Sequence, residues 1–256
     1  MNVFVFDIET VPDVDGGRRL LGLDALDDKG VAEAMFYQRR QQTDGEFLRH
    51  YLHRVVAISV VFRSDDRLKV WSLGDETADE KELIQRFFDG IDKYTPTLVS
   101  WNGGGFDLPV LHYRMLIHGV VAPRYWDSGD DDRDFKWNNY LSRYHQRHTD
   151  LMDVLSAYNA RATASLDDIA NLLGFPGKMG MSGAKVWDAY QQGEIKRIRD
   201  YCELDVLNTY LIYLRYQLIR GQLLESEYIA ECRLLRQVLA DESKPHFDAF
   251  LSAWKS

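Results

Sequence analysis

Cysteines and long apolar runs are scarce in this sequence of 256 residues. Its two cysteines, Cys202 and Cys232, form no CxxC pair, which favours ordinary reduced thiols of a cytosolic protein over a disulfide framework or a zinc site. No apolar run approaches the roughly 18 residues that a membrane span needs. The first residues, MNVFVFDIETV, contain no basic leader and no small-residue cleavage site. We therefore expect a cytoplasmic protein that does not bind membranes.

Basic residues are outnumbered by acidic ones: 31 Lys and Arg stand against 40 Asp and Glu, which gives a net charge of −9. This excess argues against a general nucleic-acid coat protein, because phosphate binding usually needs a basic surface. It does not exclude an enzyme that acts at a chain end and contacts only a few phosphates. Carboxylates that hold metal ions also add to the negative sum, and the bound cations reverse its local sign.

The periodicity of apolar residues predicts an α/β domain with a mixed sheet. Strands are expected in four apolar runs, at residues 3–8, 55–62, 68–73 and 97–101. Helices are expected in four further segments, at residues 80–91, 108–118, 166–173 and 195–220. We interpret residues 1–256 as a single domain, in which residues 13–53 are an insertion and residues 222–256 a helical extension.

Two acids, Asp7 and Glu9, follow the first apolar run. Residues two apart on a strand point to the same face, so both carboxylates are expected side by side at the strand's end. Burying like charges together is costly unless a cation neutralises them, which favours a metal site. The alternative is a strand that simply ends there with both acids in solvent.

Two later acids also occupy notable positions. Asp107 follows the turn Asn102-Gly103-Gly104-Gly105-Phe106 near a helix start, where an acid is also favoured by the helix dipole alone. Tyr201 and Asp205 lie four residues apart on an expected helix and share one face. An amphipathic helix with the tyrosine in the core and the aspartate outside explains this second pair equally simply.

Together, the Asp-x-Glu, Phe-Asp and Tyr-x-x-x-Asp motifs resemble those of the DEDD superfamily of 3′–5′ exonucleases. The tyrosine is typical of the DEDDy branch, to which the proofreading domain of family-B DNA polymerases belongs. The segments FDIET, SWNGGGFDLPVL and YCELDVLNTYLIYLR look similar to stand-alone predicted exonucleases of the polymerase-B type. The resemblance spans about residues 3–214.

This resemblance implies a ribonuclease H-like fold, with a mixed five-stranded sheet flanked by helices. It also implies two divalent cations, Mg²⁺ or Mn²⁺, held by four carboxylates: Asp7, Glu9, Asp107 and Asp205. Hard oxygen ligands suit these ions, and two of them about 4 Å apart can stabilise both the attacking and the leaving oxygen. Tyr201 is expected to position the attacking water, because a free tyrosine pKa of about 10 makes a poor base at neutral pH.

Five further residues are expected to contact the substrate: Thr10, Asn102, Phe106, Lys178 and Lys185. The two lysines lie in or beside the glycine-containing loop 177–183, which is either a phosphate-binding loop or a plain connector. Phe106 either stacks on a terminal base or packs in the core. Asp150 is interpreted as a helix cap or a supporting residue rather than a ligand, and His148 as a surface residue.

The expected activity is exonucleolytic cleavage from the 3′ end of single-stranded DNA, with single-stranded RNA as the alternative substrate. Residues 13–53 include Arg18, Arg19, Arg39 and Arg40, and we hypothesise that this insertion forms a lid or clamp over the 3′ end. Two other classes stay open. One is a phosphatase resembling the haloacid dehalogenases, whose second acid would be Asp rather than Glu9; the other is a non-catalytic nucleic-acid binding module.

Overall fold

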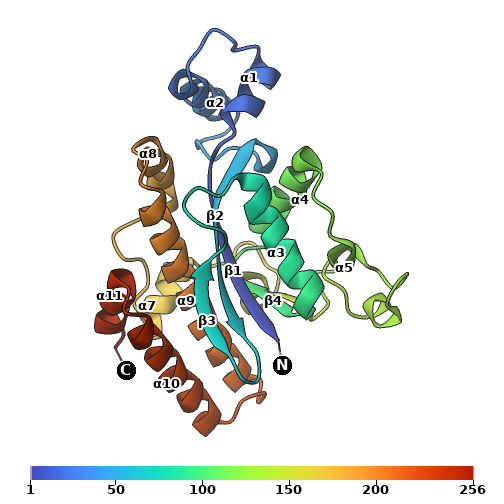
Figure 1. The fold of residues 1–256 in the computed structure, drawn as a ribbon, viewed down its shortest axis with the longest axis vertical. Coiled ribbons are helices and arrows are strands. Elements are labelled where there is room, and N and C mark those ends of the chain that lie inside the picture. The colour runs from blue at the N-terminus through green and yellow to red at the C-terminus, as the bar shows by residue number, and fades with distance from the viewer. Residues whose placement is uncertain (1, 256) are drawn as a thin grey trace.

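A five-stranded mixed sheet forms the centre of the structure, which is a computed structural model that describes residues 2–255. Its strands are β1 (Val3–Pro12), β2 (His53–Arg63), β3 (Leu68–Ser72), β4 (Thr97–Ser100) and β5 (His148–Asp150). Their spatial order is β3-β2-β1-β4-β5 (Figure 1). β1, β2 and β3 are antiparallel, whereas β4 and β5 continue the sheet parallel to β1. The expected fold class is confirmed.

Helices cover both faces of this sheet (Figure 1). One layer contains α3 (Glu80–Tyr94), α4 (Asp107–His118) and α5 (Pro123–Trp126). The other contains α7 (Leu166–Leu172), α9 (Ile195–Ile219), α10 (Glu225–Glu242) and α11 (Pro245–Ala253). In β1, Phe4 and Phe6 pack towards the first layer, and Val3 and Val5 towards the second. Because strand residues alternate, Asp7 and Glu9 continue the row that faces α9.

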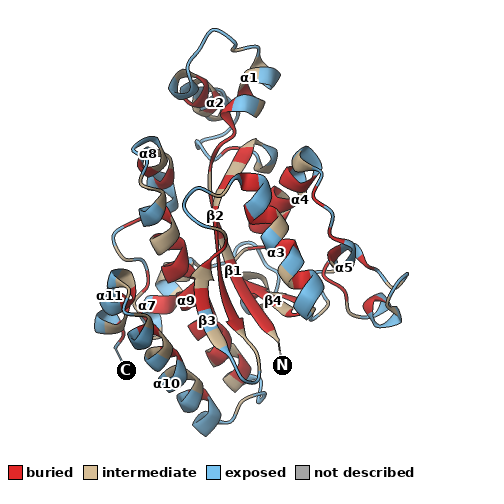
Figure 2. Ribbon diagram, viewed as in Figure 1, coloured by how far each residue is buried: buried red, intermediate tan, exposed pale blue. Residues whose placement is uncertain are grey.

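The helix α9 is the most deeply buried helix of this fold. All of its residues from 201 to 214 are buried, as the red segment beside the sheet shows in Figure 2. The helix contacts β1 and β2 on one side and α7, α10 and α11 on others. Tyr201 and Asp205 are therefore both buried, so the amphipathic alternative, with the aspartate in solvent, is wrong.

The segment between β1 and β2 is a small helical unit that projects beyond the end of the sheet (Figure 1). It consists of α1 (Val14–Leu21), α2 (Asp28–Gln42) and the 3₁₀ turn η1 (His50–Leu52). Val31, Met35 and Leu48 are the centre of its own apolar cluster. The two helices approach closely at Gly17, where a Cβ atom would lie 2.3 Å from the Met35 sulfur.

Three local differences from the sequence-based expectations affect the site. β1 runs to Pro12 rather than ending at Ile8, because Thr10–Pro12 pair with the start of β2. His148 is buried in β5 and not on the surface; its Nε2 lies 2.8 Å from the Ser100 hydroxyl. The segment after it contains both β5 and the short helix α6 (Leu151–Leu155).

The remaining short elements lie in the connections: η2 (Arg133–Lys136), η3 (Gly183–Lys185) and α8 (Val186–Gln191). The expected C-terminal helices are present as α10 and α11. Among the helices of residues 2–255, none is long and apolar enough to cross a membrane.

Candidate active site

The carboxylates of Asp7 and Glu9 lie on the part of β1 that is no longer paired with β4. β4 pairs with β1 only through Val3–Val5, so the following residues of β1 have no strand on that side. The backbone N–H of Ile8 donates instead to Oδ1 of Asp107, at 3.1 Å. The first residue of α4 thus replaces a strand partner, and this places the Asp107 carboxylate beside those of β1. A bulge between Glu9 and Thr10 marks the same point, where bulges commonly redirect side chains.

The glycine turn that precedes Asp107 is held by Asp150. The Asp150 carboxylate accepts hydrogen bonds from the backbone N–H groups of Asn102, at 2.9 Å, and Gly104, at 2.8 Å. The same carboxylate caps α6, so the interpretation of Asp150 as a helix cap and supporting residue is confirmed. The turn also requires glycine at position 103, where a Cβ atom would lie 2.3 Å from the Ser100 hydroxyl.

α9 supplies the other wall of the site. Tyr201 and Asp205 are one helical turn apart, and a hydrogen bond from Tyr201 to the Asp205 carboxylate acts to lower the aspartate's pKa. Cys202, between them, points at β1: its thiol lies 3.4 Å from the Asp7 carbonyl oxygen and 3.5 Å from Asp7 Oδ2. The sequence analysis missed this contact, because an isolated cysteine on a buried helix carries no signal of its neighbours.

Burial raises the pKa of all four carboxylates, and those of Asp7 and Glu9 are raised further by their neighbours in the cluster. Burial raises the pKa of Asp7 well above its usual value, and the charges of Asp107 and Asp205 raise it further. Burial likewise raises the pKa of Glu9, with added contributions from Asp7 and Asp205. The pKa of Asp107 reaches about 7, mainly through burial, and that of Asp205 about 6 for the same reason. Each value means that the protein alone poorly accommodates the ionised cluster.

This donor set suits a hard divalent cation. Oδ1 of Asp205 is buried and has no hydrogen-bond partner among the described residues, which leaves a lone pair free for a ligand. Oxygen atoms of Asp7 and Glu9 and the sulfur of Cys202 all lie within 4.8 Å of one another. Burial raises the pKa of the Cys202 thiol well above its usual value, and its sulfur lies within hydrogen-bonding distance of Asp7. The carboxylate oxygens are the ligands that magnesium and manganese prefer.

Of the two lysines expected to contact the substrate, the structure brings one to the carboxylates. The charge of Lys178 acts to lower the pKa of Asp7, Glu9 and Asp205, so its ammonium group lies close to the cluster. Its loop is fastened to α9 by Asn208, which exchanges two hydrogen bonds with the backbone of Gly177, at 3.1 and 3.0 Å. Lys185 is exposed at the end of η3, and within residues 2–255 no hydrogen bond or ion pair joins it to the carboxylates.

Thr10 and Phe106 each adjoin a carboxylate residue in the sequence, and both contact the ring of His53. The Thr10 hydroxyl lies 2.8 Å from Nδ1 of His53, whose ring packs against Phe106. Phe106 also contacts two residues of the insertion, Phe47 and His50. The sequence analysis did not single out Phe47 or His50. Asn102 lies in the turn, in the left-handed region with φ of 65°, and its backbone rather than its side chain has a described role there.

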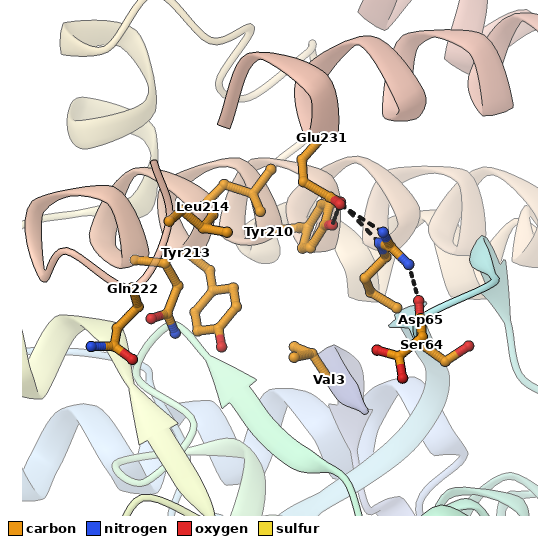
Figure 3. Close-up of a pocket in the computed structure, with 11 residues that line it drawn as sticks. Val3, Ser64, Asp65, Tyr210, Tyr213, Leu214, Gln222 and Glu231 are labelled. Atoms are coloured by element: carbon orange, nitrogen blue, oxygen red, sulfur yellow. Dashed lines mark hydrogen bonds and ion pairs between the residues drawn. The ribbon is translucent and has the colours of Figure 1, made fainter. Parts of the chain in front are cut away.

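A separate cavity of about 300 Å³ lies at the opposite end of β1 (Figure 3). In it, Tyr213 of α9 faces Val3, and Glu231 of α10 forms an ion pair with Arg63, with nitrogen and oxygen 2.6 Å apart. Val3 precedes Asp7 by four residues of extended strand, or about 13 Å. This cavity is therefore not part of the carboxylate site.

Comparison with known proteins finds an exonuclease family and two DNA polymerases that are similar to this chain. Residues 45–254 match the family described as predicted 3′–5′ exonuclease related to the exonuclease domain of PolB. A DNA polymerase of Archaeoglobus fulgidus is 26% identical over 161 residues, which are 62% of this chain and 19% of that protein. The catalytic polypeptide of Saccharomyces cerevisiae DNA polymerase epsilon is 26% identical over 146 residues, 54% of this chain and 6% of that polypeptide.

Among solved structures, the family B DNA polymerase from the hyperthermophilic archaeon Pyrobaculum calidifontis has a similar fold. The TM-score is 0.50 at 18% sequence identity, and the similarity covers 100% of this chain and 27% of that chain. The chain therefore corresponds to less than a third of each of these polymerases. The family match begins after Asp7 and Glu9, so the positions of these two acids rest on the structure described above.

Proposed function

The chain belongs to the family of predicted 3′–5′ exonucleases related to the exonuclease domain of PolB, and from this premise we propose that it removes nucleotides from the 3′ end of single-stranded DNA. In the proposed reaction, water adds to the phosphorus atom of the terminal phosphodiester and the bond to the 3′ oxygen breaks. The products are a nucleoside 5′-monophosphate and a strand shortened by one residue. DNA is favoured over RNA because the similar curated proteins are DNA polymerases.

The observation that carries this proposal is the convergence of four carboxylates from three separate elements, three of them buried and that of Asp7 half-buried. β1 supplies Asp7 and Glu9, α4 supplies Asp107, and α9 supplies Asp205. Their raised pKa values and the unpartnered Oδ1 of Asp205 indicate that the ionised site is unfavourable without a cation. We propose that these four groups hold two divalent ions, Mg²⁺ or Mn²⁺, in the DEDDy arrangement. When bound, such ions stabilise negative charge on the attacking and leaving oxygens.

Tyr201 is proposed to position the attacking water. Burial raises the pKa of Tyr201, and the neighbouring charges of Asp205 and Glu9 raise it further, so the phenol stays protonated at any working pH. A protonated phenol is not a general base. Its hydroxyl is engaged with Asp205 on one side, and its remaining lone pair can orient a water molecule beside the carboxylates.

Lys178 is proposed to contact a phosphate of the bound strand. Its side chain is exposed, yet its charge acts on three of the four carboxylates, so it stands at the mouth of the site. The clamp around the 3′ end, suggested for residues 13–53, is proposed to be a fixed wall of the site.

The direct test is cleavage of a 5′-labelled single-stranded DNA and the matching RNA, in Mg²⁺, Mn²⁺ or chelator. The proposal predicts a ladder that shortens from the 3′ end with metal and is absent with chelator. Asp7→Ala removes the ladder, whereas the control Asp248→Ala, at an exposed acid of α11, retains it. Faster loss of the RNA would assign the ribonuclease alternative, and metal-dependent binding without hydrolysis would replace the enzyme by a binding module.

A further inference from the structure

We propose that a cavity within the insertion binds a backbone phosphate of the strand whose 3′ end lies at the carboxylates. The cavity has a volume of about 420 Å³ and lies between α1, α2 and η1, the unit that projects beyond the sheet in Figure 1. Six of its ten lining residues precede residue 45, where the match to the exonuclease family begins. The inference rests on the proposed function, because it names where the substrate of that function continues beyond the cleaved bond.

The polar part of the cavity lining can donate hydrogen bonds and contains no acid. Arg39 and Arg49 contribute guanidinium groups, Gln38 and Gln42 contribute amides, and Tyr51 contributes a hydroxyl. No Asp or Glu of residues 2–255 lines the cavity, although acids outnumber basic residues 40 to 31 in the whole chain. Guanidinium groups bind phosphate oxygens through two parallel hydrogen bonds. The lining therefore favours an anionic ligand, and a phosphate ester in particular.

Both guanidinium groups have donors left for such a ligand. Arg39 donates from Nε to the Phe47 carbonyl oxygen, at 2.7 Å, which leaves its two terminal nitrogens. Arg49 is exposed, and within residues 2–255 no acid forms an ion pair with it or with Arg39. By contrast Arg40, the neighbour of Arg39 on α2, pairs with Glu46. The charge of the two arginines that line the cavity is thus available to attract an anion.

Helix stability explains one of these arginines but not both. Arg39 lies in the last turn of α2, where the helix dipole alone favours a cation. Arg49 lies outside α2, immediately before η1, and its side chain lines the same cavity. Positive charge from two separate elements converges on one cavity, and the dipole of α2 does not account for that, so we assign it to a ligand.

The floor of the cavity is the apolar core of the insertion. Met35 and Leu48 are 2% and 4% exposed and belong to its cluster of buried side chains. A guanidinium and a phosphate attract each other more strongly beside such a low-dielectric surface than in open solvent. The carbon face of a deoxyribose can pack on this floor while its phosphate meets the arginines. The lining as a whole therefore suits one nucleotide unit of a strand.

The cavity lies close enough to the carboxylates for one strand to reach both. Arg49 and Tyr51 flank His50, whose Nε2 lies 2.9 Å from the carbonyl oxygen of Gly105. Gly105 precedes Asp107 by two residues. With 3.8 Å between consecutive Cα atoms, the backbones of Arg49 and Asp107 are at most about 20 Å apart. A strand whose 3′ end lies at the carboxylates therefore brings its backbone to the cavity within a few nucleotides.

A buried network holds the insertion, and with it the cavity, in a fixed position relative to α4. Arg114 of α4 is 4% exposed and binds Asp13, at 2.5 Å, where the insertion begins. The same guanidinium binds Glu80 of α3, whose Oε1 accepts from the backbone N–H of Val55, at 2.6 Å, just after the insertion ends. A phosphate held in the cavity is therefore expected to align the strand with the helix that begins with Asp107.

The test is a binding scan with neutral linkages. Each member of a set of 5′-fluorescent oligo(dT) strands carries one methylphosphonate, an uncharged phosphate analogue, at a different linkage, and its Kd is measured in Ca²⁺. The parent should bind about tenfold more weakly when one internal linkage, upstream of the two at the 3′ end, is neutral. Arg49→Gln should bind the unmodified strand about tenfold more weakly and show no extra loss at that linkage. The same profile in both proteins, or no such internal linkage in the parent, overturns the proposal.

Controls separate a phosphate contact from a general effect of charge. The slope of log Kd against log salt concentration should be smaller by about 0.7 in Arg49→Gln, the value for one phosphate of a single strand. Lys29→Gln removes the same charge from an exposed position of α2 outside the cavity, and should leave the scan unchanged. Arg49→Lys should retain the slope but lose part of the affinity, because lysine lacks the planar fork. Equal losses in Arg49→Gln and Lys29→Gln would contradict a specific site.

Two further measurements separate the possible sources of the phosphate and the two proposals. Thymidine 5′-monophosphate should bind the parent and Arg49→Gln equally, because a nucleotide at the carboxylates does not reach the cavity. Arg49-dependent binding of this nucleotide, with a scan that does not depend on Arg49, would assign the cavity to free nucleotides instead. A parent that shortens DNA in Mg²⁺ without Arg49 dependence in the scan sinks the phosphate site alone. An Arg49-dependent scan without hydrolysis by the parent sinks the proposed function alone.

Discussion

Asp107→Asn should stabilise the metal-free protein at alkaline pH while abolishing activity. The Asp107 carboxylate is 4% exposed, and burial raises its pKa from 3.8 to about 7. This shift of about three units corresponds to ~4 kcal/mol by which the ionised group destabilises the fold at pH 8. Asparagine keeps the oxygen that accepts from Ile8 but adds two donors that must be desolvated. We therefore expect a gain of about half that amount, ~2 kcal/mol, or a Tm increase of roughly 4–8 °C.

The pH dependence of this gain has a definite sign. A carboxyl whose pKa is higher in the folded than in the unfolded state binds its proton more tightly when folded, so its penalty is absent at low pH. The penalty grows as pH rises from about 4 to 7 and is constant above that. The difference in Tm between Asp107→Asn and the parent should fall along this curve in chelator as the pH is lowered and become negative near pH 4, where only the cost of the asparagine donors remains.

With saturating Mn²⁺, the parent should have a higher Tm than Asp107→Asn, which is the reverse of the order expected in chelator. If the proposed ligands hold the ion, the folded parent should gain about 2.7 kcal/mol at a hundredfold excess over Kd, whereas the variant should gain less because it lacks one proposed ligand. Differential scanning calorimetry over pH 4–9, with chelator and with Mn²⁺, measures both effects. Asp44→Asn, at an exposed loop position, controls for the general loss of one negative charge. An Asp107→Asn variant that unfolds below the parent at pH 8 in chelator would refute the assigned cost of burial.

Two further predictions concern groups that position the site. Tyr201→Phe should keep the Mn²⁺-induced rise in Tm and lower kcat by up to roughly 10²-fold, with no change in the alkaline limb of the pH–rate profile, because the phenol is not a base. A shifted alkaline limb would contradict this role. Arg114→Met should cost about 3–5 kcal/mol in urea unfolding, since it leaves Asp13 and Glu80 buried without their cation. Its control, Arg86→Met, breaks an exposed pair with Glu82 and should cost at most about 0.5 kcal/mol; equal costs would show that the buried network is not a brace.

The order of strands and helices could be predicted because each rests on local pattern. The runs at 55–62 and 97–101 are predicted as strands from their β-branched residues, and the long helix at 195–220 from its length. The extension of β1 to Pro12 could not be predicted, because Thr10–Pro12 become a strand only by pairing with His53–Val55, across the whole insertion. Sequence pattern reports propensity, whereas this pairing is a long-range contact.

The residues of the candidate site also fall into two groups, those that local sequence pattern predicts and those that matter only through long-range contacts. Asp7, Glu9, Asp107, Tyr201 and Asp205 were predicted from the spacing of their motifs and the resemblance that this spacing carries, both of which are properties of the chain. Cys202, Asn208 and Phe47 were missed, because their importance lies in what they touch: a β1 carboxylate, the lysine loop and the ring of Phe106. Conversely, Lys185 looked equivalent to Lys178 in the sequence, but only Lys178 acts on the carboxylates, because Asn208 holds its end of the loop against α9.

The position of the insertion follows from the same gap in the sheet that brings the Asp107 carboxylate beside β1. β1 leaves its partner β4 after Val5 and continues without a strand on that side, which frees the edge for Asp107 beside Asp7 and Glu9. A strand that projects beyond its sheet must be held by something else. Here the insertion that follows it is anchored through Arg114 to the very helix that begins with Asp107. The Asp107 carboxylate is thus positioned by a helix that Arg114 ties to the residue that follows β1, so one buried ion pair fixes α4 against the strand that supplies Asp7 and Glu9.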